Sequence, residues 1–152
     1  MPRLELEMTY RFRTRGPLQS AAGSPPGERQ YWEMTEGTLT GPRIRATIAM
    51  PGGDWYRPGP GDFGRPDVRV QLITDDQEIV LLRYTGLVPA TERFKQAAEN
   101  GGSTGYEDQY MRMVMFFDTA AAKYAWLTES VYIAKGRIVG KNEIEYQIYR
   151  VT

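Results

Sequence analysis

The chain has 152 residues, and its 19 basic and 19 acidic side chains give a formal net charge of zero. This length suits one domain with a sizeable core, so we expect a single domain over residues 1–152. Nucleic acids and anionic membranes attract proteins with a basic excess, which this chain lacks, so we expect neither as a partner.

The sequence contains no Cys and no His. Disulfides, thiolate nucleophiles, metal sites built on thiolate or imidazole, and the Ser-His-Asp triad are therefore excluded. Acid/base chemistry would have to use Asp, Glu, Tyr or Lys, with Arg as a fixed positive charge, and we expect no cofactor and no metal. No apolar run approaches the ~20 residues of a membrane span, and the N-terminal residues lack the apolar core of a signal peptide, so a cytoplasmic protein is expected.

Alternation of apolar and polar residues runs through most of the chain and predicts β-strands. In the first such stretch, Leu4, Leu6, Met8, Tyr10 and Phe12 share one face. Stretches rich in aromatic and β-branched residues add further candidates. In chain order, the predicted strands are residues 4–12, 29–34, 43–50, 67–73, 78–84, 110–117, 130–136 and 143–151.

The stretches between these strands predict turns, loops and one helix. Residues 74–78, "TDDQE", form a compact polar turn and therefore a hairpin. Residues 18–28 and 57–66 are too rich in Gly and Pro for regular structure. Residues 89–102 open with Pro, carry helix formers and end in Asn-Gly-Gly, which predicts one short helix.

About eight antiparallel strands with one helix make up a small barrel or a sandwich, and we prefer a closed antiparallel β-barrel. A closed barrel of this size encloses room for packed side chains or for one small ligand. The polar face of a strand can then line a cavity instead of facing solvent.

Several segments resemble the DUF3237 family (also called UPF0311) of small bacterial and fungal proteins. They are "GTLTGPRIRATIAMPGGDW", "DVRVQLITDD", "YTG", "YMRMVMFFDTAAAKYAWLTESVYIAKG" and "YQIYRV", in the family's order from residue 37 to residue 151. The chain departs from the family's pattern at Gln77, where Gly is usual, at Thr128 and at Asp118. The resemblance implies a closed antiparallel β-barrel and a homodimer, and it implies little about activity.

Asp54 is the first candidate for a catalytic residue. It follows Gly52-Gly53, which can adopt backbone shapes closed to other residues, and it precedes Trp55-Tyr56. A carboxylate next to a Trp loses solvation, which raises its pKa and suits it to proton transfer near neutral pH. The alternative is an Asp that only caps a loop. We expect residues 52–70 to be a rim loop that delivers Asp54 and Trp55 to a cavity.

Arg69 and Tyr84 are the other two candidates for catalysis. Arg69 lies between Asp67 and Gln71 on the polar face of its strand. If that face lines the barrel, Arg69 needs a carboxylate partner such as Asp54 or Asp67, and it would stabilise negative charge on a substrate. The alternative is an outward Arg in a surface ion pair worth ~0–1 kcal/mol. The hydroxyl of Tyr84 either donates a proton or hydrogen bond or is structural.

Further residues are candidates for contact with the substrate, each with a structural alternative in core or barrel packing. Asp67 and Arg112 are polar residues that alternate with apolar ones, and the aromatic residues suit the walls around an apolar ligand. The candidate binding residues are Trp32, Trp55, Tyr56, Asp67, Arg112, Tyr124 and Trp126.

The leading hypothesis is a cofactor-independent acid/base enzyme that acts on a small, mostly apolar ketone, enone, phenol or lactone inside the barrel. Asp54 would move the proton, Arg69 would hold negative charge and Tyr84 would assist, in an isomerase, hydratase/lyase or cyclase reaction. One alternative is a non-catalytic, lipocalin-like carrier or sensor of a small hydrophobic or aromatic molecule. Another is a structural dimer whose barrel is filled by side chains.

Overall fold

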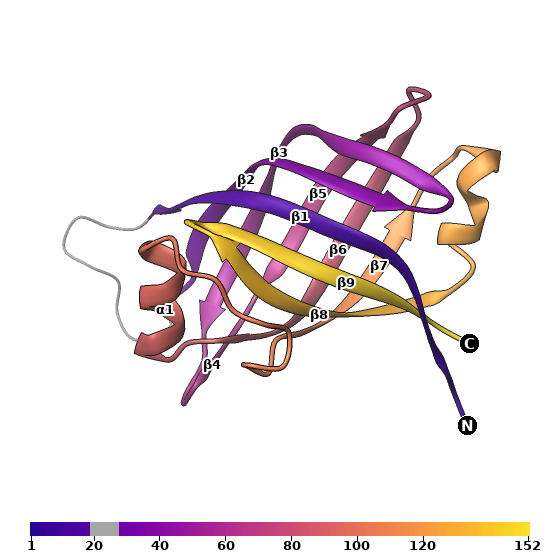
Figure 1. The fold of residues 1–152 in the computed structure, drawn as a ribbon. Coiled ribbons are helices and arrows are strands. Elements are labelled where there is room, and N and C mark those ends of the chain that lie inside the picture. The colour runs from indigo at the N-terminus through magenta and orange to yellow at the C-terminus, as the bar shows by residue number, and fades with distance from the viewer. Residues whose placement is uncertain (19–27) are drawn as a thin grey trace.

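The computed structural model describes residues 1–18 and 28–152 of the chain (Figure 1). Most of the irregular stretch expected at residues 18–28 therefore lies outside the described residues. The elements in chain order are β1 (Leu4–Leu18), β2 (Gln30–Gly41), β3 (Ile44–Pro58), β4 (Phe63–Arg65), β5 (Asp67–Thr74), β6 (Ile79–Pro89), α1 (Glu92–Glu99), β7 (Arg112–Asp118), the 3-10 helix η1 (Ala122–Leu127), β8 (Val131–Gly140) and β9 (Glu143–Val151).

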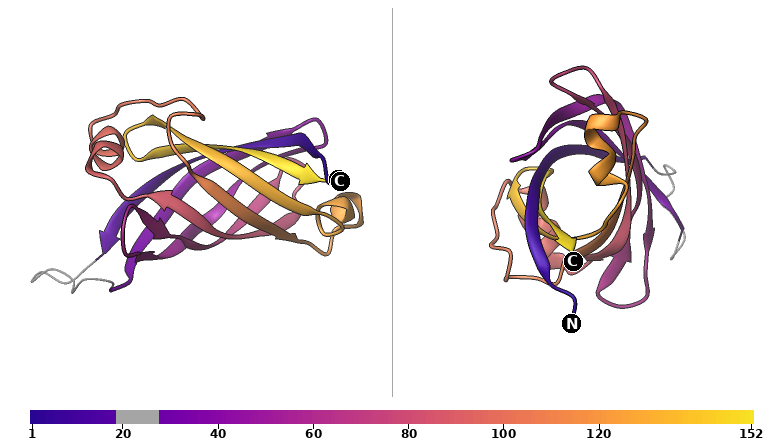
Figure 2. Two further views of the ribbon diagram at one scale, coloured as in Figure 1. Left: turned by 90° about the horizontal axis from the view of Figure 1, so that it is seen from below. Right: turned by 90° about the vertical axis from the view of Figure 1, so that its right-hand side faces the viewer.

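Eight of these strands close into an antiparallel barrel. β1 pairs with both β2 and β9, β2 with β3, β3 with β5, and β5 with β6. β6, β7, β8 and β9 then pair in sequence, which completes the ring seen along its axis in Figure 2. β4 is an extra strand that pairs with the ends of β3 and β6. The barrel predicted from the sequence is confirmed, and the sandwich alternative is wrong.

The strands are longer than predicted, and this corrects the expected rim loop. Residues 52–58 of that expected loop belong to β3, which pairs with β2 on one side and with β5 on the other. Pro58 is tolerated because it ends its strand, where its missing N–H is not needed in the ladder. Only residues 59–62 remain irregular before β4. The helix η1 was not predicted at all.

The hairpin predicted at residues 74–78 joins β5 to β6. The amide of Thr74 donates to the carbonyl oxygen of Glu78 at 2.9 Å, and the Thr74 hydroxyl accepts from the Glu78 amide at 2.8 Å. Gln77 has a φ of 68°, in the left-handed region that favours glycine. Position 77 therefore has a left-handed backbone conformation, which explains why Gly is usual there in the DUF3237 family.

α1 is shorter than the predicted helix and lies across one end of the barrel (Figure 1). The side chain of Thr91 caps it by accepting from the amide of Phe94 at 3.4 Å. Gly101, with a φ of 75°, follows the C-terminal end, as the Asn-Gly-Gly sequence predicts. Among the described residues, no helix has the length and apolar character needed to span a membrane.

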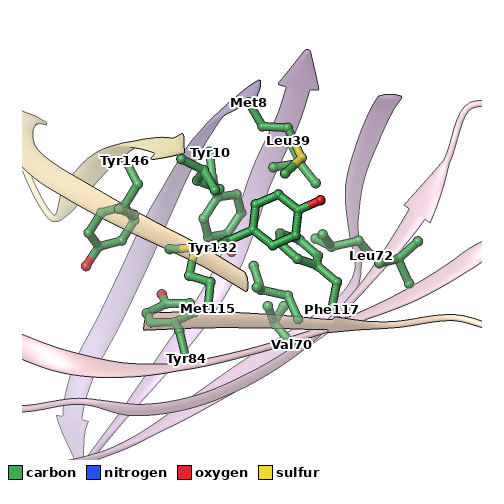
Figure 3. Close-up of a cluster of buried hydrophobic side chains, with 14 of the residues drawn as sticks. Met8, Tyr10, Leu39, Val70, Leu72, Tyr84, Met115, Phe117, Tyr132 and Tyr146 are labelled. Atoms are coloured by element: carbon green, nitrogen blue, oxygen red, sulfur yellow. The ribbon is translucent and has the colours of Figure 1, made fainter. Parts of the chain in front are cut away.

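The interior of the barrel is packed solid only toward the end that η1 covers. Inward-facing apolar side chains from several strands pack together at that end. They include Leu39, Leu72, Leu82, Phe117 and Tyr132, all at most 6% exposed. Figure 3 shows Leu72 and Phe117 on one side of this cluster and Tyr84 and Tyr146 on the other. At the η1 end, the hydroxyl of Tyr124 donates to a carboxylate oxygen of Asp76 at 2.7 Å. The end that α1 covers is open to a cavity.

Candidate active site

The cavity lies inside the barrel below α1 and has a volume of about 420 Å³. Side chains from β1, β2, β3, β6 and β9 form its walls, and Phe94, Lys95, Ala98 and Glu99 of α1 border its mouth. The walls are mostly apolar and aromatic, which is usual for sites that bind small molecules. Wall residues used below are Phe12, Trp32, Asp54, Tyr56, Tyr84 and Tyr146.

Asp54 lies on the inward face of β3 even though the strand contains two irregularities. The register of β3 against β5 shifts once before and once after Met50. One shift turns the following side chains to the other face of the sheet, and the second shift turns them back. Asp54 therefore points inward like Ile44 and Ala46 at the start of the strand, whereas Met50 is exposed.

Gly52 allows β3 to approach β5 closely just before Asp54. A Cβ atom at position 52 would lie 2.6 Å from Cβ of Val70 and 2.8 Å from the carbonyl oxygen of Arg69. The backbone must therefore move if any side chain is introduced at this position.

We predict that Gly52→Ala lowers the free energy of unfolding by about 1–3 kcal/mol, because the new methyl group overpacks the contact between strands. Urea denaturation measures the loss. Gly105→Ala is the matched control, since its Cβ would meet only the end of the Asp108 side chain, at 3.3 Å. A Gly52→Ala protein as stable as the control would contradict the close approach of these two strands.

The carboxyl group of Asp54 is only 8% exposed. Burial raises its pKa to about 7, and the nearby Asp67 carboxylate adds to the rise. The backbone amide of Asp67 works in the opposite direction, because it donates to Oδ1 of Asp54 at 2.9 Å. Asp54 is thus held by one hydrogen bond and is present in both protonation states near neutral pH.

Three tyrosines surround Asp54 in the cavity wall. Burial raises the pKa of Tyr84 and of Tyr146 well above the usual value of 10, and the charge of Asp54 contributes to both. Burial also raises the pKa of Tyr56, again with a contribution from Asp54. All three hydroxyls are therefore neutral at physiological pH and can donate hydrogen bonds.

Among the described residues that line the cavity, Asp54 is the one charged group inside it. The other charged groups lie at its mouth. These are Lys95 and Glu99 of α1, both exposed. Within residues 1–18 and 28–152, no cluster of three or more Asp or Glu side chains is placed to hold a metal ion.

Several predicted site residues lie together in the cavity wall. Asp54, Tyr84, Tyr56 and Trp32 all line it, as expected for residues that contact a ligand. Their roles in catalysis or binding stay predictions.

Arg69 is not part of the cavity, and the prediction that it lies on the wall is wrong. It alternates with the buried Val68 and Val70, so its side chain is on the outer face of β5 and exposed. The Asp67 side chain is also outside, 3.7 Å from Arg29, and the backbone amide of Asp67 is the group that bonds to Asp54. Trp55 likewise points outward and is 46% exposed.

The other three predicted binding residues also lie away from the cavity. The guanidinium of Arg112 is 4.9 Å from the ring centroid of Tyr110 on the outer surface. Tyr124 and Trp126 belong to η1 at the opposite end of the barrel. There Trp126 packs under the guanidinium of Arg43, whose central carbon is 3.7 Å from the ring centroid. None of the three is among the residues that line the cavity.

Tyr146 and Phe12 line the cavity although neither was predicted to do so. Both lie on the apolar faces of their strands, where the alternation predicts packing and not ligand contact. A hydroxyl on an otherwise apolar face, as in "EIEYQI", was the feature that could have pointed to Tyr146.

Comparison with known proteins places the chain in a family without assigned activity. A family model described as "Protein of unknown function (DUF3237)" matches residues 2–151. No curated protein matches the chain. The homodimer and the cytoplasmic location expected from the sequence stay predictions.

The fold is shared with solved structures over nearly the whole chain. A conserved protein of unknown function from Rhodopseudomonas palustris is 16% identical with a TM-score of 0.83, covering 100% of this chain and 98% of that one. A β-barrel-like protein from Acinetobacter baumannii is 25% identical with a TM-score of 0.78, covering 100% and 97%. A structure described as an enzyme from Penicillium herquei is 17% identical with a TM-score of 0.72, covering 99% and 95%.

Proposed function

Because this chain belongs to the DUF3237 family, whose description assigns no activity, its function has to be argued from its cavity, and we propose a cofactor-independent acid/base enzyme. Its substrate is a small, mostly apolar ketone, enone, phenol or lactone bound inside the barrel. One observation carries the proposal: an ionisable carboxyl group, Asp54, is buried in the wall of an apolar cavity with a pKa of about 7.

A pKa near the working pH is what a general acid/base needs. A carboxylate with the ordinary pKa of Asp is a weak base, and a carboxyl group with a much higher pKa is rarely ionised at neutral pH. Asp54 lies between these limits because burial and its single backbone hydrogen bond oppose each other. The group can therefore accept a proton and return it within one reaction.

The proposed step is proton transfer next to a carbonyl group. The Asp54 carboxylate takes a hydrogen from the carbon beside the carbonyl as H⁺, the C–H electron pair forms a C=C bond, and the carbonyl π pair moves onto oxygen. With a β,γ-unsaturated ketone, Asp54 then returns the proton to the γ-carbon. The electron pair on oxygen re-forms the C=O bond, the C=C bond moves into conjugation, and the isomerisation is complete. The enolate can also lose a leaving group from the neighbouring carbon, which is a lyase reaction. Addition of water or of an internal hydroxyl to an enone forms the same enolate, which gives the hydratase and cyclase reactions.

Tyr84 assists this step as a neutral hydrogen-bond donor. Negative charge that develops on the substrate oxygen needs donors that are already in place. Arg69 cannot supply them, because it lies outside the barrel. Tyr84 lines the same cavity as Asp54.

The barrel fold is compatible with an enzyme and equally with a binding protein. A structure described as an enzyme from Penicillium herquei shares the fold, at an identity that supports the fold alone. A carrier or sensor of small hydrophobic molecules is the second candidate, because the cavity walls are mostly apolar and the barrel is closed around them.

Hydrogen exchange distinguishes these two functions without knowledge of the natural substrate. Small cyclic ketones, enones and lactones are incubated with the protein in D₂O, and NMR follows deuterium uptake beside the carbonyl. We expect the protein to speed this exchange by on the order of 10²-fold or more over buffer for ligands that bind. Binding without any faster exchange would establish the carrier and refute the enzyme.

A further inference from the structure

Two tyrosine hydroxyls lie where the cavity meets the packed half of the barrel. Tyr84 of β6 and Tyr146 of β9 line the cavity and also belong to the buried cluster. In Figure 3 they lie together at one side of that cluster. The side chain of Tyr84 is 3% exposed, and its hydroxyl has no hydrogen-bond partner among the residues that the structure describes.

An unpartnered buried hydroxyl is a binding feature when it borders a cavity. Leaving such a group without a hydrogen bond costs free energy, so a ligand atom that pairs with it gains affinity. The Tyr84 hydroxyl oxygen is itself shielded from solvent, so a small shift of its ring toward the cavity that it lines brings it into contact with such an atom.

The rings that carry these hydroxyls are held by contacts with other aromatic rings. The Tyr146 ring stacks on Phe12 with centroids 5.7 Å apart, and the Tyr84 ring meets it edge to face, also at 5.7 Å. Gly136, paired with Tyr146 across β8 and β9, leaves space for the ring, since a Cβ there would lie 2.6 Å from Cε1 of Tyr146. Donors on packed rings are worth more to a ligand, because little side-chain freedom is lost on binding.

Asp54 and Tyr84 are placed to contact one ligand together. Val68 of β5 pairs with Asp54 on one side and with Tyr84 on the other, so all three lie in one cross-strand row. The backbones of Asp54 and Tyr84 are thus two strand spacings apart, roughly 10 Å, and both side chains point into the cavity.

The charges around the cavity disfavour an anionic ligand. Asp54 is the one ionisable carboxyl group buried among the described lining residues, and the one cation among them, Lys95, is exposed at the mouth. A carboxylate that entered would meet Asp54 with no cation beside it, and burying an unpaired charge is costly.

We propose that the cavity selects an uncharged cyclic or aromatic ketone or lactone, which enters with its carbonyl oxygen first and accepts a hydrogen bond from the Tyr84 hydroxyl. Tyr146 supplies the second donor, and the carbon beside the carbonyl faces Asp54. The assignment of the reacting carbon rests on the proposed function, whereas the selection of a neutral carbonyl compound is a claim about binding alone. The volume, about 420 Å³, is nearly three times the ~150 Å³ of an apolar cavity that accepts benzene, so a fused two-ring compound fits.

Three ligands of one shape test this proposal. Indane has no oxygen, indan-1-one adds the carbonyl group, and indane-1-carboxylate adds a negative charge. Their affinities are measured by isothermal titration calorimetry with the unmodified protein and with Tyr84→Phe, Tyr146→Phe and Tyr149→Phe. Tyr149 is the matched control, because it lies on the outer face of β9 and donates to Gln147 at 2.9 Å. Tyr84→Phe is expected to fold, since it removes a hydroxyl that bonds to none of the described residues.

We expect Tyr84→Phe to weaken indan-1-one binding about tenfold and to leave indane binding unchanged, because one hydrogen bond to a buried group is lost. Tyr146→Phe should show a smaller loss and Tyr149→Phe none, and indane-1-carboxylate should bind at least tenfold more weakly than the ketone. Unchanged binding of indan-1-one by Tyr84→Phe, equal binding of the carboxylate, or no binding of the ketone would each overturn the proposal. If the protein binds the ketone through Tyr84 but does not speed the exchange of the ketone's hydrogens, the binding proposal stands and the proposed enzyme activity is refuted.

Discussion

Asp54→Asn is expected to slow deuterium uptake into a bound ketone by about 100-fold or more. The amide is close in shape to the carboxyl group and can still accept the hydrogen bond from the Asp67 amide, so the cavity is preserved. It cannot accept a proton at neutral pH, and general-base catalysis is worth about 10²–10⁴-fold. NMR in D₂O gives the rate, and calorimetry with the same ketone shows that binding is retained.

The pH dependence of the same exchange identifies the base. Only ionised Asp54 accepts a proton, so the rate should rise with pH and level off above about 7, where its pKa lies. Arg69→Ala is the matched control, because Arg69 lies on the outer face of the barrel and its loss should leave the rate within about twofold. If Asp54→Asn exchanges as fast as Arg69→Ala, Asp54 is not the base.

Asp54→Asn is also expected to stabilise the protein at alkaline pH, by up to about 4 kcal/mol. Folding raises the pKa of Asp54 from 3.8 to about 7, roughly three pH units at 1.36 kcal/mol each. Below pH 4 the group is protonated in both the folded and the unfolded chain, and its contribution is fully present. Between about pH 4 and 7 only the unfolded chain ionises, so stability is lost as the pH rises. Asn carries no charge and escapes this loss.

Urea denaturation of both proteins at pH 5 and pH 8 measures this effect. The advantage of Asp54→Asn should be larger at pH 8, and Asp118→Asn, which alters an exposed carboxylate at the end of β7, should show no such growth. The same advantage at both pH values would mean that the Asp54 carboxyl ionises in the folded protein with an ordinary pKa, and the proposed base would lose its basis.

The barrel was predictable because its determinants are local. Alternation with period two identifies each strand, and Met8, Tyr10 and Phe12 share the buried face as predicted. Leu4 and Leu6 do not, because the register of β1 against β9 shifts between Leu6 and Met8 and leaves both exposed. The Gly- and Pro-rich ends of strands were harder. Residues 52–58 look like a loop in the sequence, but pairing with both β2 and β5 holds them in β3.

Alternation gives two faces for each strand without saying which one points inward. Arg69 was placed on the cavity wall because a barrel lumen can be polar, yet in this protein the Val68 and Val70 side fills the interior. Asp54 lines the cavity as expected, and its role in catalysis stays a prediction. It lies on the face that alternation from Ile44 and Ala46 gives, because the two shifts of register around Met50 cancel each other.

The barrel has one half filled by side chains and one half that holds the cavity. This arrangement separates the residues that stabilise the fold from those that bind a ligand, two demands that usually compete. The packed side chains near η1, such as Leu39, Leu82 and Tyr132, contribute apolar burial that opposes unfolding. Side chains such as Trp32 and Phe94 border empty space, so their replacement removes fewer contacts and costs less stability. Substitutions in the cavity can therefore change which compounds bind while the stability of the fold changes little. Proteins with this fold could then diversify in ligand specificity without compensating mutations elsewhere.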